Sequence, residues 1–293
     1  MKIENNHKYW QAVVCMLPLA LALVLGGHGS TPAAAQAADG IFVPGFWDPN
    51  RRFPKPDRSK VRSIRFLTEL ESPPFSFTAP DGLPAGFNVD LARAVCGELD
   101  IPCTIQELKW DLLVEAIAEG RGDAIIAPIP ITAETRKTYA FTNPFLGRPG
   151  RFVATKTTLV ESVSASAIAG RKVAVVAGTP HETFLKTYFP QVEIASFDNT
   201  SEARKALTGG AVELMFSDAL AASVWLNSAA AKDCCIFIGD AYADPHFFGE
   251  GIAVAVDPAR RELREAIDFA MSRIYQDGRY FEIFLRYFPR GYY

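Results

Sequence analysis

The sequence is poor in histidine and has no block of basic residues. Lysine and arginine total 30 against 33 aspartates and glutamates, which gives a formal net charge of −3. Nucleic acid binding needs clustered Lys and Arg against the phosphates, so we expect no nucleic acid partner. Only His181 and His246 lie beyond residue 37, far apart in the sequence, which argues against a metal site.

The signatures of common catalytic and cofactor sites are also missing. The chain has no G-x-S-x-G elbow, no phosphate loop and no G-x-G-x-x-G motif. Nothing in the sequence places His181 or His246 beside a nucleophile. We therefore predict no catalytic residue, no cofactor and no enzyme activity.

One long apolar run, residues 12–27, lies near the N-terminus. It follows Lys2 and Lys8 and precedes the small-residue site Ala35-Gln36-Ala37. At about 16 residues, the run is shorter than the roughly 20 that span the hydrocarbon of a membrane. We therefore expect residues 1–37 to be a cleaved signal peptide rather than a membrane anchor, and the protein to be exported to the periplasm.

Cysteine is scarce, and the two pairs beyond residue 37 differ in spacing. Cys96 and Cys103 lie at the end of a predicted helix and the start of a predicted strand. Because an oxidising compartment preserves disulfides, we predict that these two are bonded. Bonding the neighbours Cys234 and Cys235 would need a strained eight-membered ring. Two buried thiols are the favoured reading there, and a disulfide stays open as the alternative.

The order of elements predicts an α/β fold. Residues 38–60 hold four prolines without periodicity and read as an extended arm. From Val61 onward, apolar strands alternate with amphipathic helices, which is typical of parallel βαβ units. We expect strands at 63–69, 103–108, 123–129, 171–178, 193–197 and 212–218, and helices at 87–99, 110–120, 180–189 and 201–210, with two more after 258 divided by Asp277-Gly278.

Two segments of the sequence can be laid over each other. The stretches GRGDAIIAP (120–128) and GAVELMFSD (210–218) each have a glycine that ends a helix, an acidic residue, an apolar strand and then a loop. Two lobes built alike are the simplest explanation.

Candidate binding residues follow the predicted strands. In VVAGTPHETF, Gly178 allows a sharp turn, and Thr179 with Glu182 forms a T-x-x-E capping box whose helix start suits a small anion. In PITAETRK, Thr132 is the matching cap and is followed by Arg136. Open α/β sheets bind ligands at the carboxyl ends of their strands, so we expect a cleft between two such ends. Phe87 is placed to offer an aromatic face there, although a core position is the ordinary alternative.

Several motifs, taken in order, resemble a known family. These are SPPFSF…DG…GFNVDLARAVCGEL, WDLLVEAIAEGRGDAIIAPIPIT, FTNPF, VAVVAGT, LTGGAVELMFSD, FGEGIAVAV and YQDGRYFEIFLRYFP. Between about residues 64 and 288 the chain is similar to family 3 periplasmic solute-binding proteins, the polar amino acid class that serves ABC importers. Some basic amino acid binders of this class carry a disulfide with the spacing of Cys96 and Cys103.

The resemblance implies a two-lobed type II periplasmic-binding-protein fold whose lobes are joined by two crossover strands. Lobe 1 would comprise residues 61–149 plus 249–293, and lobe 2 residues 150–248. A small-molecule ligand would bind between the lobes, and the hinge would close on it. The closed protein, a monomer, would then dock on a membrane permease.

The resemblance also assigns roles to single residues. Phe87 would stack on the ligand, and Thr179 would hold an α-carboxylate. Asp218 would pair with an α-ammonium, and Glu69 falls where basic amino acid binders place an acid for a distal cation.

Three positions depart from the family pattern. Ser72 stands where the family has its first stacking aromatic, and Pro130 stands where a serine often donates to the carboxylate. Thr135 occupies the position of the carboxylate-binding arginine, and Arg136 follows one residue later. The carboxylate side is therefore weakened while the amine side is intact. Either Arg136 or Arg151 replaces the lost arginine, or the ligand has no α-carboxylate.

The sequence therefore predicts a periplasmic solute-binding component of an ABC importer whose ligand is an amino acid or a related small amine. Two other functions remain as alternatives. One is a secreted enzyme on the same scaffold, like the cyclohexadienyl dehydratases, with Glu69 as its acid or base. The other is a binding module that feeds a sensor or a redox system.

Overall fold

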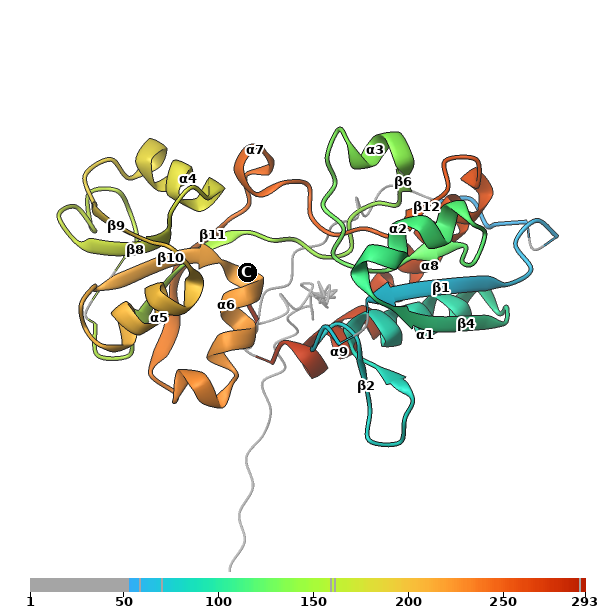
Figure 1. Ribbon diagram of the computed structural model, residues 1–293, viewed down its shortest axis with the longest axis horizontal. Helices are drawn as coiled ribbons and strands as arrows, with labels where there is room; N and C mark the ends of the chain where they lie inside the picture. Colours follow the sequence, from blue (N-terminus) through green and yellow to red (C-terminus); the bar gives the residue numbers. More distant parts are fainter. Residues whose placement is uncertain (1–52, 58, 70, 159, 161, 290) are drawn as a thin grey trace, which may run out of the picture. The chain divides into compact units, whose positions relative to one another are not determined.

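The computed structural model describes residues 53–57, 59–69, 71–158, 160, 162–289 and 291–293. The predicted signal peptide (1–37) and residues 38–52 of the predicted arm lie outside the described residues. The described chain forms two five-stranded sheets and one two-stranded sheet (Figure 1). The predicted α/β class is confirmed.

The first sheet is built from both ends of the described chain. Its strands, in sheet order, are β4 (Cys103–Leu108), β1 (Ile64–Glu69), β5 (Ala124–Ile125), β12 (Ala255–Val256) and β6 (Ala140–Phe141). Strand β1 runs parallel to β4 and β5, whereas β12 is antiparallel to β5 and β6. The helices of this part are α1 (Phe87–Leu99), α2 (Trp110–Ala118), α3 (Thr135–Thr138), α8 (Arg261–Gln276) and α9 (Arg279–Tyr287). Figure 1 shows α1 alongside β1 and β4. The small sheet pairs β2 (Phe77–Thr78) with β3 (Pro84–Ala85).

The second sheet comes from the middle of the chain. Its strands, in sheet order, are β11 (Cys235–Tyr242), β7 (Gly150–Thr155), β10 (Leu214–Asp218), β8 (Lys172–Val176) and β9 (Glu193–Phe197). Strand β8 is parallel to β9 and β10, and β7 is antiparallel to β10 and β11. The helices here are α4 (Pro180–Tyr188), α5 (Thr200–Thr208), α6 (Ala219–Leu226), the short 3-10 turn η1 (Ala229–Ala231) and α7 (Pro245–Phe248). The predicted lobe boundaries fall at the start of β7 and the end of α7.

The internal similarity seen in the sequence has a structural counterpart. Gly120 and Gly210 follow α2 and α5 with φ values of 69° and 74°, which glycine adopts without strain. After each glycine an acidic side chain, Asp123 or Glu213, accepts a backbone N–H from β1 or β8 at 2.9 and 3.1 Å respectively. The same local design therefore begins a central strand in both sheets.

The two cysteine pairs are both bonded. Cys96 and Cys103 form the predicted disulfide between the end of α1 and the start of β4. Cys234 and Cys235 are also joined, so the favoured expectation of two free thiols was wrong. Adjacent side chains of a regular strand point to opposite faces. The backbone is irregular directly before this pair, since Lys232 and Asp233 have φ values of 48° and 53°.

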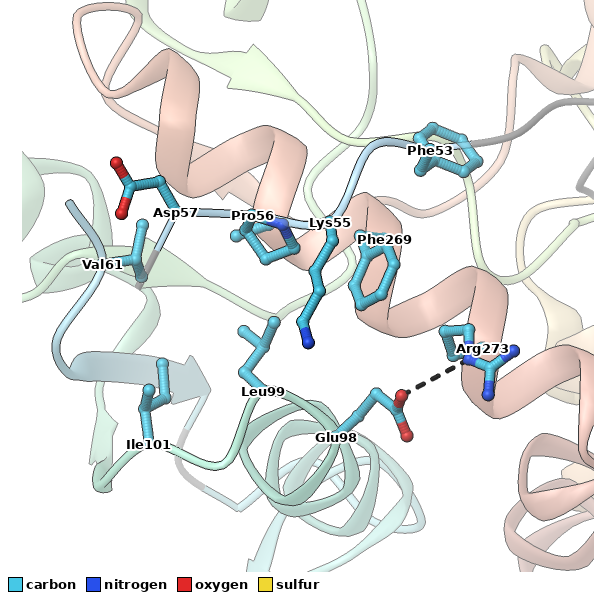
Figure 2. A pocket seen from close by; sticks show the side chains of 11 residues that line it. Phe53, Lys55, Pro56, Asp57, Val61, Glu98, Leu99, Ile101, Phe269 and Arg273 are labelled. Carbon is cyan, nitrogen blue, oxygen red and sulfur yellow. Dashed lines mark ion pairs between the residues drawn. The ribbon is translucent and has the colours of Figure 1, made fainter. Parts of the chain in front are cut away.

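The described end of the predicted arm packs against the first sheet's helices. Phe53 lies on the hydrophobic core of this part, and the ammonium of Lys60 is 3.2 Å from a carboxylate oxygen of Glu262 in α8. Figure 2 shows Lys55 pointing into a cavity of about 540 Å³ walled by the end of α1 and by α8. Glu98 and Arg273 face each other there at 3.5 Å.

Candidate functional site

The predicted site residues follow the carboxyl ends of parallel strands in both sheets. In the first sheet, β1 ends at Glu69, and the chain leaving β5 leads to Thr132. In the second sheet, β8 leads to Gly178 and Thr179, and β10 ends at Asp218. Ligands of open α/β sheets bind at such ends. Glu69, Thr132, Gly178, Thr179 and Asp218 thus lie at or after strand ends of the two sheets.

The segment after β1 is held by backbone pairing. The backbone N–H of Ser72 donates to the carbonyl of Ser76 at 2.7 Å, and that of Ser76 returns the bond at 3.0 Å. The hydroxyl of Ser76 donates to the carbonyl of Glu69. The carboxylate of Glu69 has no hydrogen-bond partner among the residues that the structure describes.

Hydroxyl groups also close the loop around Thr132. The hydroxyl of Thr132 accepts the N–H of Thr135, the first residue of α3, at 3.1 Å, but the N-cap of α3 is Glu134 and not Thr132 as predicted. The hydroxyl of Thr135 donates to the carbonyl of Pro130 at 2.8 Å. Thr135 therefore does not restore the arginine that the family pattern has at its position.

The two arginines predicted to replace that arginine already have partners within the chain. Arg136 forms an ion pair with Glu250 at 2.6 Å. The two Nη atoms of Arg151 donate to the carbonyls of Tyr293 and Gly239 at 3.1 and 2.7 Å, and its guanidinium lies 4.6 Å from the ring centre of Phe237. In this conformation the charge of Arg136 is balanced by Glu250, and both Nη groups of Arg151 donate to backbone carbonyls of the chain.

The predicted capping box is present at the start of α4. Its Glu182 carboxylate, however, accepts the Gly178 N–H that was expected to bind an anion. The hydroxyl of Thr179 accepts the N–H of Glu182 at 3.4 Å, and the carboxylate of Glu182 accepts the N–H of Gly178 at 2.9 Å. Hydrogen bonds from the Ser196 hydroxyl, the Gly178 N–H and the Lys186 ammonium lower the pKa of Glu182 to about 2. The carboxylate of Glu182 thus occupies part of the anion-binding site that was expected at the start of α4.

Asp218 is bonded from two sides. Its Oδ1 accepts the N–H of Ala221 at 2.8 Å and so caps α6, while its Oδ2 accepts Nε–H of Arg148 at 2.8 Å. The side chain of Asp218 is 14 % exposed, whereas that of Arg148 is 46 % exposed. The carboxylate of Asp218, which was expected to bind an ammonium group, is therefore already neutralised by the guanidinium of Arg148.

His181 lies beside this ion pair. Its ring centre is 4.8 Å from that of Phe248 and 5.8 Å from that of Phe216. Burial lowers the pKa of His181 to about 4, with Asp218 opposing the shift and Arg148 adding to it. The imidazole is therefore neutral at pH 7, and its Nε2 is a buried atom without a hydrogen-bond partner among the described residues.

A cavity of about 280 Å³ lies beside Arg148 and Phe248, although neither Asp218 nor His181 lines it. Its walls include Arg148, Phe248, Glu250 and Tyr293. The hydroxyl of Tyr293 accepts the backbone N–H of Gly147 at 2.7 Å. A small polar molecule fits such a space, which has a cation, a carboxylate and two aromatic rings on its surface.

The prediction that Phe87 stacks on the ligand was wrong. The residue begins α1, and its side chain is completely buried among Phe145, Tyr280, Phe284 and Phe288. A ring without an exposed face has no surface to offer a ligand, so the ordinary alternative, a core position, applies.

Two side chains at these strand ends were not singled out in the sequence. Arg148 has no motif around it, and only its pairing with Asp218 draws attention to it. Trp110 is 40 % exposed at the start of α2, two residues beyond the end of β4 and so at the same edge of the sheet as Glu69. An exposed aromatic residue directly after a predicted strand was the available signal for it.

No group of three or more potential metal ligands occurs among the described residues. Within the same residues, no helix has the length and apolarity that a membrane span requires.

Comparison with known proteins gives consistent results. The model of the bacterial extracellular solute-binding proteins, family 3, matches residues 64–290. The putative ABC transporter arginine-binding protein 2 of Escherichia coli is 30% identical over 230 residues, which cover 78% of this chain and 92% of that protein. The histidine-binding periplasmic protein of Salmonella typhimurium is 30% identical over 230 residues, covering 78% of this chain and 88% of the relative.

A solved structure has the same fold at low sequence identity. The L-cystine solute receptor of Neisseria gonorrhoeae, in its unliganded open conformation, aligns with a TM-score of 0.69 at 19% identity, covering 80% of this chain and 96% of the receptor. The likeness confirms the predicted two-lobed α/β fold.

Proposed function

Because the chain belongs to the bacterial extracellular solute-binding proteins of family 3, we propose that it captures a small polar solute between its two lobes and delivers it to the permease of an ABC importer. The match from residue 64 to residue 290 carries this proposal, because it spans both sheets and every predicted binding residue. The protein acts in the periplasm as a monomer after its signal peptide is removed, and it catalyses no reaction.

The solute class follows from the relatives and from the free side chains. The named relatives bind arginine and histidine, so amino acids and closely related small molecules are the first class to test. The carboxylate of Glu69 has no partner among the described residues, which supports a role for it in binding the cationic end of a solute. Trp110, at the same edge of the first sheet, supplies an exposed aromatic face that can stack on a planar cation.

Lobe closure links binding to delivery. A solute that contacts both strand ends at once gains those contacts only in the closed arrangement, so binding shifts the population toward that arrangement. The permease then distinguishes the loaded protein from the empty one by shape.

The test is a thermal-shift screen of residues 38–293 after the protein has been unfolded, dialysed and refolded to remove bound solute. Amino acids, polyamines and small organic acids are added singly. Solute at about a thousand times its dissociation constant stabilises the fold by roughly 4 kcal/mol. For a chain near this size, the melting temperature rises by about 2–4 °C for each kcal/mol of stabilisation. We expect at least one clear shift. Turnover of prephenate or arogenate, or no shift with any solute, would contradict the proposal.

A further inference from the structure

The position of Arg148 opposite Asp218 is set by the second sheet. In the antiparallel pair of β7 and β10, Gly150 lies directly opposite Asp218. The backbone N–H of Ala219 donates to the carbonyl of Pro149 at 2.8 Å and extends this pairing by one step. Arg148 is therefore the diagonal neighbour of Asp218, a distance that a long side chain spans. Arg148 precedes β7, just before the predicted boundary between the lobes, and its ion pair with Asp218 extends the pairing of β7 with β10.

This arrangement changes what Asp218 can recognise. With Nε of Arg148 on Oδ2 and the Ala221 N–H on Oδ1, the carboxylate already has a cation and a backbone donor. An incoming ammonium would meet the guanidinium of Arg148 beside it, and the repulsion between the two cations offsets its attraction to Asp218.

The guanidinium has donors left over. Only Nε of Arg148 is used in the hydrogen bonds found within the described part of the chain, so its two Nη atoms remain for another acceptor. The side chain is nearly half exposed and lines the 280 Å³ cavity. Glu250 shares the lining, but its charge is balanced by Arg136.

Aromatic rings pack closely next to this cavity. Gly150 has no room for a side chain, because an added Cβ would lie 2.5 Å from the ring of Phe216 and 2.8 Å from that of Phe248, and Phe248 also lines the cavity. The neutral ring of His181 packs on Phe248, and its Nε2 has no hydrogen-bond partner among the described residues. A hydrogen bond between an ionised donor and an ionised acceptor is stronger than one between neutral groups, so the half-exposed guanidinium of Arg148 can still hold an anion.

We propose that Arg148 selects the solute: its two Nη atoms bind a carboxylate of the solute, and Asp218 orients the guanidinium instead of binding an ammonium. The planar guanidinium matches a carboxylate with two parallel hydrogen bonds. This inference rests on the proposed function and specifies its solute as an acid that needs no α-amino group.

The experiment compares three forms of each solute by calorimetric titration. The first set is arginine, agmatine without the carboxylate, and 4-guanidinobutanoate without the α-amine. The second set is histidine, histamine and imidazolepropanoate, and succinate serves as an acid without a cation. We expect binding of at least one amine-free acid and no measurable binding of the carboxylate-free amines.

Variants then assign the effect to one side chain. Arg148→Met should weaken acid binding about tenfold or more, because hydrogen bonds to a charged group are lost. Arg148→Lys keeps the charge but loses the paired donors, so its affinity for the acid should lie between those of the wild type and Arg148→Met. The matched control is Arg286→Met, which removes another half-exposed arginine whose partner, Asp90, lies at the start of α1. Its affinity should equal that of the wild type, and circular dichroism checks that every variant is folded.

The outcomes separate this inference from the proposed function. Two results overturn the inference and leave the proposed function intact. In the first, the wild type binds the carboxylate-free amines but none of the acids. In the second, Arg148→Met binds acids as tightly as the wild type does. If no acid and no amine binds to the wild type, both fall.

Discussion

Both sheets have candidate binding residues at the carboxyl ends of their parallel strands, but the side chains at these two edges make different contacts. At the first sheet, the hydroxyls of Ser76 and Thr135 donate to backbone carbonyls of their own loops, so the edge is mainly a shaped backbone. At the second sheet, the edge carries an ion pair and an imidazole nitrogen that has no partner in the described part of the chain. The first edge thus combines a shaped backbone with the carboxylate of Glu69, which has no partner among the described residues, whereas the carboxylate at the second edge is already paired with Arg148.

The backbone character of the first edge predicts the largest effect. Gly86 has φ 122°, and an added Cβ would lie 2.4 Å from the carbonyl oxygen of Phe75. Gly86→Ala combines left-handed strain with a clash against backbone, so we expect a loss of about 4 kcal/mol in the free energy of unfolding. Urea titration measures it. Gly82→Ala is the control, because its φ is 81° but nothing lies within 4 Å, and it should lose only about 1 kcal/mol. Equal losses would mean that the edge is not held by close backbone packing.

The buried imidazole predicts an acid-dependent effect at the second edge. The pKa of His181 is about 4 in the folded protein against about 6.5 unfolded, so only the unfolded chain gains a proton between these values. Stability is therefore full above about pH 6.5 and falls as the pH drops to about 4, by on the order of 3 kcal/mol. His181→Gln should lack this part of the pH dependence in unfolding experiments.

The exposed residue His246 provides the control for that measurement. His246→Gln should follow the wild-type pH profile. If His181→Gln loses stability with acid as steeply as the wild type does, the imidazole is not held neutral by its surroundings.

The two disulfides sharpen the contrast between the sheets. Cys96 and Cys103 are separated by seven positions, and Cys234 and Cys235 by one. In the chain-entropy account, the first bond contributes about 2.5 kcal/mol and the second less than about 1 kcal/mol. Replacing each pair by serine, followed by guanidinium unfolding, tests this. A larger loss from the second pair would show that it stabilises the native fold by other means.

Glu182 gives the smallest of the four effects. Its pKa is about 2 folded against 4.5 unfolded, so its contribution is present above about pH 4.5 and disappears as the pH falls through 2. Glu182→Gln should cost about 1 kcal/mol at pH 7, as expected for a helix cap. Glu134→Gln, at the first edge, is the control, since its side chain is 81 % exposed and pairs only with Lys137 among the described residues. A change within about 0.5 kcal/mol is expected there in thermal unfolding.

Elements with a clear period were predictable, and others were not. The helix 87–99 and the strands 103–108 and 193–197 have the predicted bounds, because their apolar positions recur at the helical or the strand period. Helix α6 was missed, since ALAASVWL is buried on nearly all sides and has no polar face to reveal a period. Strands β7 and β11 were not predicted; the family resemblance implied two crossover strands between the lobes without assigning residues to them.

The sequence offered candidate site residues but not their contacts. Strand ends pointed to Gly178 and Thr179, and the family resemblance implied Glu69 and Asp218. The pairing of Asp218 with Arg148 could not be predicted, because it joins residues 70 positions apart and depends on the register of β7 against β10. Phe87 was misplaced for a related reason, since only the tertiary packing of α9 on α1 shows that its ring is enclosed.

The diagonal placement of Arg148 also bears on how such a protein diverges. The side chain contributes no backbone pairing to β7 and caps no helix, so position 148 can vary without altering the sheet that carries it. A duplicated gene that replaces Arg148 with a neutral residue would expose the carboxylate of Asp218 to amines in a single mutational step. A change of nutrient class would then require no new scaffold, and paralogues that differ at this position would be expected to serve different importers.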